Sequence, residues 1–334
     1  MTGKRSQLRV GIVGCGLIGT KRAGALGDDV LVGAFDVRTS AADALVADHG
    51  GQRCASLGEL LALAPDVVIV ATIHSELAKA ACAALEAGAH VLVEKPAGIG
   101  VPEIDAIATA AAANRRLVKV GFNHRFHPGI ARAVNEARSG TFGAPLYLRA
   151  RYGHGGRLGY EKEWRADRKL SGGGEIVDQG MHLIDLSYWL LGELPVHASM
   201  LRTQFWDAPV DDNAVLLLGS PGGVGDPSPF ALLHASWTEW KNTFSLEIAC
   251  QDAKFAVDGL VRSYGSQCLR IFRMRPELGP PDVEEVRYPD RDLSWRAEWE
   301  HFADAIAGLS GPVLLGDLAS ARYAWSCIER AQRG

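Results

Sequence analysis

Three glycines near the start of the chain, Gly14, Gly16 and Gly19, constrain its fold more than any other feature. They follow a short apolar run at 8–13, which predicts a strand, and precede a helical pattern that reaches Leu26. In such a strand–turn–helix unit the first glycine permits a tight turn, the second lets the backbone approach a pyrophosphate, and the third lets the helix pack on the sheet. The spacing therefore predicts a doubly wound α/β domain that binds a dinucleotide.

The first 123 residues continue the alternation of strands and helices, as expected for a parallel sheet with crossover helices. Further strands are predicted at 30–35, 66–71, 90–93 and 117–122, and helices at 40–49, 76–87 and 102–113. Ser56 and Glu59 have the spacing of a capping box and predict one more short helix. We therefore assign residues 1–123 to an N-terminal Rossmann dinucleotide-binding domain.

The pattern changes after Asn123. Strands are predicted at 146–152, 214–218, 230–237 and 244–250, with a Gly/Pro-rich hairpin loop at 220–229, one strong helix at 175–191, and closing helices at 299–308 and 316–332. Runs of strands with few crossover helices indicate an α+β domain with a large, mostly antiparallel open sheet. We assign residues 124–334 to this second domain, which we expect to bind substrate and to mediate oligomerisation.

Asp36 ends the second predicted strand, where a carboxylate can accept hydrogen bonds from the adenosine ribose. The same carboxylate repels a 2′-phosphate and so favours NAD, whereas Arg38 could contact that phosphate and leaves NADP open. The residues of this segment expected to bind the cofactor are Gly14, Cys15, Gly16, Leu17, Ile18, Gly19, Asp36, Val37 and Arg38.

Two further features carry the chemistry. Lys95 stands at the carboxyl end of a predicted strand, where open parallel sheets place ligands, and Pro96 keeps it out of the helical conformation and permits a cis bond. Asp178 and His182 are four residues apart and share one face of the predicted helix, with Asp185 on the same side. The opposite face is apolar and contains Ile176, Leu183 and Leu190.

A carboxylate and an imidazole on one helix face suit acid–base work near neutral pH. A pair that only holds the helix is an equal alternative, and a solvated charge is the alternative for Lys95. We predict no metal, because one histidine without a matching ligand set does not make a zinc site.

Composition excludes several classes of protein. The net charge of −4 has no basic block, which argues against nucleic acid or an anionic membrane as partner. No apolar run is long enough to span a bilayer and no signal peptide is recognised. The six cysteines are scattered, which favours reduced thiols. We expect a soluble cytoplasmic protein.

Taken together, these residues resemble the Gfo/Idh/MocA family of glucose–fructose oxidoreductases and inositol dehydrogenases. The likeness covers essentially the whole chain and rests on GCGLIG at 14–19, Ala71-Thr72, Glu94-Lys95-Pro96, GFNHRF at 121–126 and GGGEIVDQGMHLIDL at 172–186. It implies a homodimer or homotetramer assembled through the open sheet. It also adds Ala71, Thr72, His74, Glu94, Lys95 and Asn123 to the expected NAD contacts. One departure is Ile73-His74, where the family commonly has proline after the threonine.

The resemblance implies that Lys95, Asp178 and His182 form the catalytic set of an oxidoreductase. Hydride would move between a carbinol carbon of a sugar, inositol or nucleotide sugar and C4 of the nicotinamide. His182 would take the hydroxyl proton, Lys95 would stabilise the developing charge on that oxygen, and Asp178 would hold the substrate or orient the other two.

Substrate contacts are expected from Lys95, Asp178 and His182 and from Arg125, His154, Arg157, Trp164 and Arg165, although loop packing and surface ion pairs would account for some of the latter. Asp212 and Asn213 could also reach the pocket, and Trp237 and Trp240 could either stack on a sugar or serve the sheet core or a subunit interface. Two other functions remain open: a glycoside hydrolase or lyase that works by transient oxidation with NAD, and a non-catalytic sensor of the cofactor.

Overall fold

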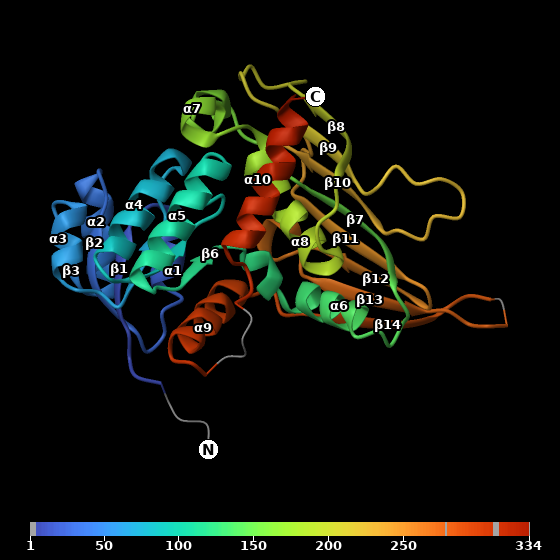
Figure 1. The fold of residues 1–334 in the computed structure, drawn as a ribbon, viewed down its shortest axis with the longest axis horizontal. Helices are drawn as coiled ribbons and strands as arrows, with labels where there is room; N and C mark the ends of the chain where they lie inside the picture. The colour runs from blue at the N-terminus through green and yellow to red at the C-terminus, as the bar shows by residue number, and fades with distance from the viewer. Residues whose placement is uncertain (1–4, 278, 310–313, 334) are drawn as a thin grey trace. The chain divides into compact units, whose positions relative to one another are not determined.

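The computed structural model describes residues 5–277, 279–309 and 314–333 (Figure 1). The chain divides into two compact units. Unit 1 contains Met1–Asn123 and Trp295–Arg322, and unit 2 contains His124–Ser294 and Tyr323–Gly334. The expectation that all of 124–334 belongs to one domain is therefore wrong for the segment Trp295–Arg322.

Unit 1 is built on a parallel six-stranded sheet of order β3-β2-β1-β4-β5-β6. Its strands are β1 (Arg9–Val13), β2 (Val30–Phe35), β3 (Gln52–Arg53), β4 (Val67–Val70), β5 (His90–Val93) and β6 (Val118–Val120). Its helices are α1 (Leu17–Ala23), α2 (Thr39–His49), α3 (Leu57–Ala62), α4 (His74–Glu86), α5 (Val101–Asn114) and α9 (Ser294–Ile306). This order is that of a Rossmann fold and confirms the predicted class.

The start of α3 follows the predicted capping box. The Ser56 hydroxyl accepts a hydrogen bond from the Glu59 amide at 3.1 Å, and the Glu59 carboxylate accepts one from the Ala55 amide at 2.7 Å. Two amides at the helix start are thereby satisfied, although the second belongs to the residue before the cap.

Helix α9 joins unit 1 because its apolar face completes the core of that unit. Trp299 and Phe302 are buried in one cluster with Val10 and Ile12 of β1. The Trp299 indole also donates a hydrogen bond to the Asp29 carboxylate at 2.7 Å. An element near the end of the chain thus stabilises the sheet formed at its beginning.

Unit 2 contains an open eight-stranded sheet of order β14-β13-β12-β11-β7-β10-β9-β8, in which only the β7–β10 pair is parallel among the described strands. The strands are β7 (Pro145–Gly153), β8 (Val196–Arg202), β9 (Asn213–Leu218), β10 (Phe230–Ser236), β11 (Thr243–Cys250), β12 (Ala253–Asp258), β13 (Cys268–Arg273) and β14 (Asp282–Arg287). Helices α6 (Pro128–Arg138) and α8 (Met181–Leu191) pack on this sheet, and α7 (Arg168–Ser171) precedes α8. Helix α10 (Leu318–Arg333) begins in unit 1 and ends in unit 2. The predicted mostly antiparallel sheet is confirmed.

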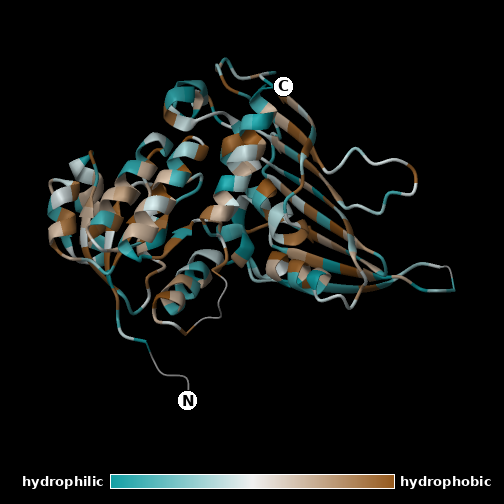
Figure 2. Cartoon of the chain, viewed as in Figure 1, coloured by the Kyte–Doolittle hydropathy of each residue, from teal (hydrophilic) through white to brown (hydrophobic). Residues whose placement is uncertain are grey.

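Buried and more accessible residues alternate along β9 and β11, and in β11 apolar and polar residue types alternate with them. Figure 2 shows both hydrophobic and hydrophilic residues along the strands of this sheet. The four strands predicted for this unit are confirmed, as is the hairpin at 220–229, where β9 and β10 pair antiparallel. Strands β8, β12, β13 and β14 and helix α6 were not predicted. Strand β14, for example, is the charged sequence DVEEVR at the sheet edge, where an apolar face is not required.

The helix predicted at 175–191 is not one regular α-helix. Its first turn, Ile176–Gly180, is a π-turn, and α8 begins only at Met181. Over a single turn the apolar spacing cannot separate α from π geometry, which explains the error.

Two further observations bear on the sequence-based expectations. All six cysteines carry free thiols, as predicted. Among the described residues, no helix combines the length and the apolar content that crossing a lipid bilayer requires.

Candidate active site

The glycine turn after β1 is shaped by close backbone contacts. Gly14 has a φ of +90°, and a Cβ atom on it would lie 2.4 Å from the carbonyl oxygen of Ala71. A Cβ on Gly19 would lie 2.0 Å from the carbonyl oxygen of Gly14. Gly16 differs, because a Cβ there would meet only the guanidinium of Arg38 at 3.7 Å. The protein itself requires glycine at the first and third positions, while the second borders open space that a pyrophosphate can approach.

Asp36 at the end of β2 binds the same turn. Its carboxylate accepts hydrogen bonds from the amides of Cys15 at 2.7 Å and Arg38 at 2.8 Å. Each carboxylate oxygen keeps a further lone pair for a ribose hydroxyl. The Arg38 side chain is 69% exposed with its Nε 3.7 Å from the carboxylate, so both candidate discriminators between NAD and NADP lie at one place.

The side chains around this turn suit an apolar ligand surface rather than covalent chemistry. Leu17 and Val37 are 75% and 89% exposed, which is unusual for such residues and leaves them available to cover an adenine ring. Burial, assisted by Asp36, raises the pKa of the Cys15 thiol to about 12. Cys15 therefore contributes its amide and not a thiolate. The structure fits a dinucleotide at this turn.

Lys95 lies two residues after the end of β5, and the Lys95–Pro96 peptide is cis. The preceding residue, Glu94, was expected to contact the cofactor, but its carboxylate lies 2.5 Å from the buried guanidinium of Arg22. Arg22 also binds Glu298 of α9 at 2.7 Å. Burial raises the pKa of the Glu94 carboxyl, and the charge of Arg22 opposes this shift. The Glu94 side chain thus ties the end of β5 to α1 and α9. A contact of Glu94 with the cofactor stays a prediction.

The other predicted cofactor residues of unit 1 lie at the ends of β4 and β6. Ala71 donates its amide to the Val13 carbonyl at 2.7 Å, and the Thr72 hydroxyl donates to the Ile73 carbonyl at 3.2 Å. His74 is buried at the first position of α4, and Asn123 is buried at the first position of the 3₁₀ turn Asn123–Phe126, shortly after β6. These positions surround the carboxyl edge of the sheet, and contact with the cofactor stays a prediction for each.

In unit 2, Asp178 lies in the π-turn and His182 in the first turn of α8. Both side chains are largely buried, at 17% exposure for the Asp178 side chain and 6% for His182. The apolar face predicted opposite them is buried, as Ile176 and Leu183 are fully covered.

The glycine run before Asp178 is held in place by hydrogen bonds and close packing. The Asp211 carboxylate accepts hydrogen bonds from the amides of Gly174 at 3.0 Å and Ile176 at 2.8 Å. Its backbone carbonyl accepts another from the Glu175 amide at 2.8 Å. A Cβ on Gly174 would lie 2.0 Å from that carbonyl oxygen, so glycine is required there. Asp211 carried no sequence signal, because it lies 37 residues from Gly174.

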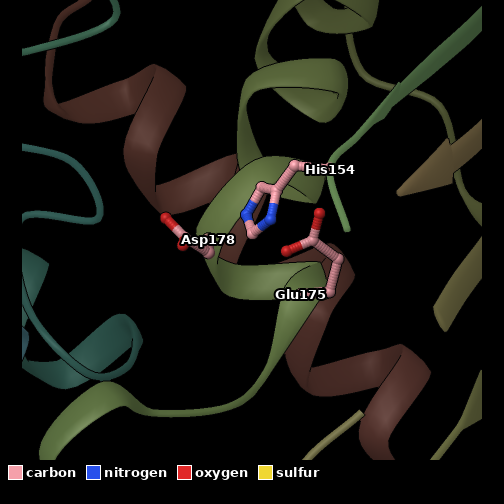
Figure 3. A group of neighbouring side chains, drawn as sticks. All are labelled: His154, Glu175 and Asp178. Atoms are coloured by element: carbon pink, nitrogen blue, oxygen red, sulfur yellow. The ribbon is translucent and has the colours of Figure 1, made fainter. Parts of the chain in front are cut away.

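His154, Glu175 and Asp178 form a cluster whose nitrogen and carboxylate atoms lie within 4.8 Å of one another. Figure 3 shows the His154 imidazole between the two carboxylates, with His154 from the segment after β7 and the carboxylates from the start of the π-turn region. Only His154 and Asp178 were predicted. Glu175 is fully buried and was quoted in the motif without being singled out.

The state of His154 makes this cluster a poor cation site. The Gly156 amide donates to Nδ1 at 2.9 Å, so the proton of the neutral ring lies on Nε2, which then acts as a donor. Burial lowers the pKa of His154; the charge of Asp178 opposes this, and Arg165 and Arg157 add to it. Arg165 lies 3.4 Å from the Asp178 carboxylate and already supplies positive charge. A metal would have to displace both arrangements, so we propose none here, and the expectation of no metal stays a prediction.

The structure brings three of the predicted substrate residues together, since His154 and Arg165 both lie beside Asp178. Arg165 also stacks over the ring of Trp164, with its guanidinium 4.6 Å from the centroid. Arg157 is different, because it is exposed and binds Glu163 at 2.5 Å. A substrate role for these residues stays a prediction.

Several weaker candidates have structural roles. Arg125 forms a two-point ion pair with Asp185 at 2.6 and 2.8 Å, and both side chains are buried. These bonds fix the start of unit 2 to α8, and a substrate contact of Arg125 stays a prediction. Asp212 is buried and accepts hydrogen bonds from backbone amides of 204–206. Trp237 is buried in an apolar cluster, which agrees with the alternative of a role in the core. Trp240 is exposed.

Sequence reasoning also missed His124, which was visible only inside the GFNHRF motif. Its ring stacks on that of His182 with centroids 3.8 Å apart and planes inclined by 26°. The contact depends on tertiary structure, because 58 positions separate the two histidines in the chain.

Comparison with known proteins agrees with both units. Residues 8–122 match the family described as "Oxidoreductase family, NAD-binding Rossmann fold", and residues 130–256 match "GFO/IDH/MocA C-terminal domain". UDP-N-acetylglucosamine 3-dehydrogenase of Acidithiobacillus ferrooxidans is 28% identical over 96% of both chains. An inositol 2-dehydrogenase of Cereibacter sphaeroides is 32% identical over 65% of both chains. Levoglucosan dehydrogenase of Pseudarthrobacter phenanthrenivorans is 30% identical, but the match spans only 43% of that protein.

Solved structures show the same fold. The UDP-N-acetylglucosamine 3-dehydrogenase from Acidithiobacillus ferrooxidans superimposes with a TM-score of 0.78 at 25% identity, over 98% of both chains. Levoglucosan dehydrogenase in complex with NADH and levoglucosan superimposes with a TM-score of 0.85 at 19% identity, again over 98% of both chains.

Proposed function

The chain belongs to the Gfo/Idh/MocA family of oxidoreductases, and on that premise we propose that it oxidises or reduces a hydroxyl-bearing carbon of a sugar, an inositol or a nucleotide sugar. The proposal is carried by the presence of a cofactor turn in unit 1 and of an acid–base pair in unit 2. Unit 1 keeps the open glycine turn and Lys95, and unit 2 keeps the partly buried Asp178 beside His182.

Unit 1 holds the nicotinamide cofactor, which when bound accepts or gives the hydride. The amides that follow Gly16 face the pyrophosphate, and Asp36 accepts the ribose hydroxyls while it keeps the turn in place. NAD is the expected cofactor. NADP is disfavoured by the charge of Asp36, to the extent that Arg38 does not compensate for it.

Unit 2 supplies the acid–base group. His182 takes the hydroxyl proton during oxidation and returns it during reduction. Lys95 donates a hydrogen bond to the same oxygen and stabilises its negative charge, and Asp178 positions the substrate. His154, fixed as an Nε2 donor, and Arg165 offer hydrogen bonds to further hydroxyl groups.

The relatives that resemble this chain act, by their names, on levoglucosan, on inositol and on UDP-N-acetylglucosamine. Their common feature is a ring with several secondary hydroxyl groups. We therefore extend the proposal to polyhydroxylated rings as substrates. We also propose a cytoplasmic homodimer or homotetramer that uses the open sheet face, where Met200, Phe230 and Leu232 are exposed.

The first experiment is to incubate the purified chain with NAD or NADP and a panel of inositols, free sugars and nucleotide sugars, and to follow absorbance at the NADH band. Reduction with one class supports the dehydrogenase and identifies its substrate and cofactor. Release of an aglycone without net NADH would support transient oxidation by a hydrolase or lyase instead. Cofactor binding without either reaction would favour a non-catalytic sensor.

The role of Lys95 has its own test. Lys95→Ala should lower kcat about 100- to 1,000-fold, because one donor to the reacting oxygen is lost, while NAD affinity stays nearly unchanged. Lys79→Ala, at an exposed position of α4, serves as the matched control. Full turnover in Lys95→Ala would remove this residue from the reaction.

A further inference from the structure

A second imidazole lies against the proposed acid–base residue. His124 belongs to the short 3₁₀ turn Asn123–Phe126, and its ring is parallel within 26° to the ring of His182 at a centroid distance of 3.8 Å. Both residues are buried, at 4% and 6% exposure. At this distance the two rings are in van der Waals contact over their faces, so one ring limits the tilt of the other.

Aromatic side chains of the sheet also contact His124. Tyr152 of β7 lies 5.0 Å from the His124 ring and 6.1 Å from the His182 ring, inclined by about 60° to each. Phe244 of β11 meets His124 edge-on at 5.8 Å. The sheet therefore supports His124, and His124 supports His182.

Two carboxylates lie on the same helical segments as His182, and each is paired with an arginine. Asp178 lies on the same helical segment and interacts with Arg165, and Asp185 of α8 is paired with Arg125. Tyr152 lies beside both histidine rings, and Tyr264 packs against Tyr152 with ring centroids 5.4 Å apart. Burial raises their pKa values above the ordinary range, so both are neutral. His127 lies beside His124, with the two ring centroids 5.6 Å apart.

We propose that His124 is a positioning residue: its ring holds the imidazole plane of His182 in the orientation needed for proton transfer. This inference rests on the proposed role of His182. In this role His124 acts through the ring of His182 and not on the reacting atoms.

Two substitutions at His124 distinguish stacking by an aromatic ring from a chemical role of the imidazole itself. His124→Phe keeps a stacked ring and should retain most of kcat. His124→Leu removes the ring and should lower kcat about 10- to 100-fold with little change in KM, because small misplacements of a reacting group have effects of this size. His127→Leu, the same change at a neighbouring buried histidine, is the control for general damage. Equal losses in the Phe and Leu variants, or a change confined to KM, would overturn the proposal.

A second readout needs no substrate and therefore separates this inference from the proposed function. In the NMR spectrum of the wild-type chain, the C–H resonances of His182 should carry the ring-current shift of a stacked neighbour. That shift should persist in His124→Phe and be lost in His124→Leu. An unchanged His182 resonance in the Leu variant would contradict the stacking role even if the chain proves to be a dehydrogenase.

Discussion

Single carboxylates organise the backbone around both parts of the candidate site. Asp36 accepts two amides of the cofactor turn, Asp211 accepts two amides before the π-turn, and Asp212 accepts amides of a neighbouring loop. Hydrogen bonds from backbone amides to an ionised acceptor are among the stronger ones in proteins. At the residue scale, therefore, acidic residues that could pass for ligands or catalysts also fix the loops that carry the chemistry.

Asp36 illustrates how the two roles can be separated. Asp36→Ala should weaken binding of both NAD and NADP, because the amides of Cys15 and Arg38 lose their acceptor. The loss should be larger for NAD, since the ribose acceptor disappears while the repulsion of a 2′-phosphate is relieved. Dissociation constants for both cofactors measure this. If their ratio stays constant while both affinities fall, Asp36 is only a structural residue.

At the scale of elements, the approach to α8 depends on one close contact between Gly174 and Asp211. Gly174→Ala should destabilise the protein by about 1–3 kcal/mol, because the new methyl group would overlap the Asp211 carbonyl. The midpoint of urea unfolding reports this loss. Gly223→Ala is the control, since nothing lies within 4 Å of a Cβ at that loop position. Equal stability of the two variants would contradict the packing argument.

Helix α9 contains a partly buried histidine, His301, which should make the stability of the protein depend on pH. Burial lowers the pKa of His301 to about 4, with Lys119 adding to the shift and Glu298 opposing it. The ring accepts a hydrogen bond from the Leu315 amide at 3.1 Å. Because the folded-state pKa lies below the ordinary 6.5, this contribution to stability is complete above about pH 6.5 and is lost as the pH falls toward 4.

The test is His301→Gln, whose amide oxygen can still accept the Leu315 hydrogen bond but does not titrate. Between pH 7.5 and 5 the unfolding midpoint of the wild type should fall further than that of the variant. Parallel curves would mean that the His301 ring is equally protonated in the folded and unfolded chains.

At the scale of the whole molecule, the Rossmann unit is not continuous in sequence. Its core includes Trp299 and Phe302, which lie beyond the whole of the eight-stranded sheet in the chain. The amino-terminal 123 residues therefore contain the cofactor motif but only part of the apolar core that stabilises it. We therefore expect the stability of unit 1 to depend on the segment Trp295–Arg322.

Trp299→Ala should accordingly destabilise unit 1 by about 3–5 kcal/mol, as expected for removal of a large buried side chain, and should weaken NAD binding although Trp299 lies in no cofactor motif. Thermal unfolding with and without NAD measures both effects. Trp240→Ala, at an exposed tryptophan, should leave both unchanged. NAD affinity and melting temperature equal to the wild type in Trp299→Ala would show that α9 is dispensable.

Local patterns in the sequence determined much of this protein: the Rossmann class, the glycine turn, the capping box at Ser56, the sheet of the second unit and the positions of Lys95, Asp178 and His182. These features depend on short-range spacing, on apolar periodicity or on motifs whose residues are contiguous in the chain. Four strands, the π-turn and helix α6 lacked such a signal.

Only the tertiary structure decided which polar residues meet. Arg22 with Glu94, Arg125 with Asp185, Gly174 with Asp211 and His124 with His182 are each far apart in the chain. A side chain's partner follows from packing of whole elements, which a local pattern does not encode. The sequence therefore identified Glu94 and Arg125 as charged residues near the expected site, but not the buried partners, Arg22 and Asp185, that their folded positions provide.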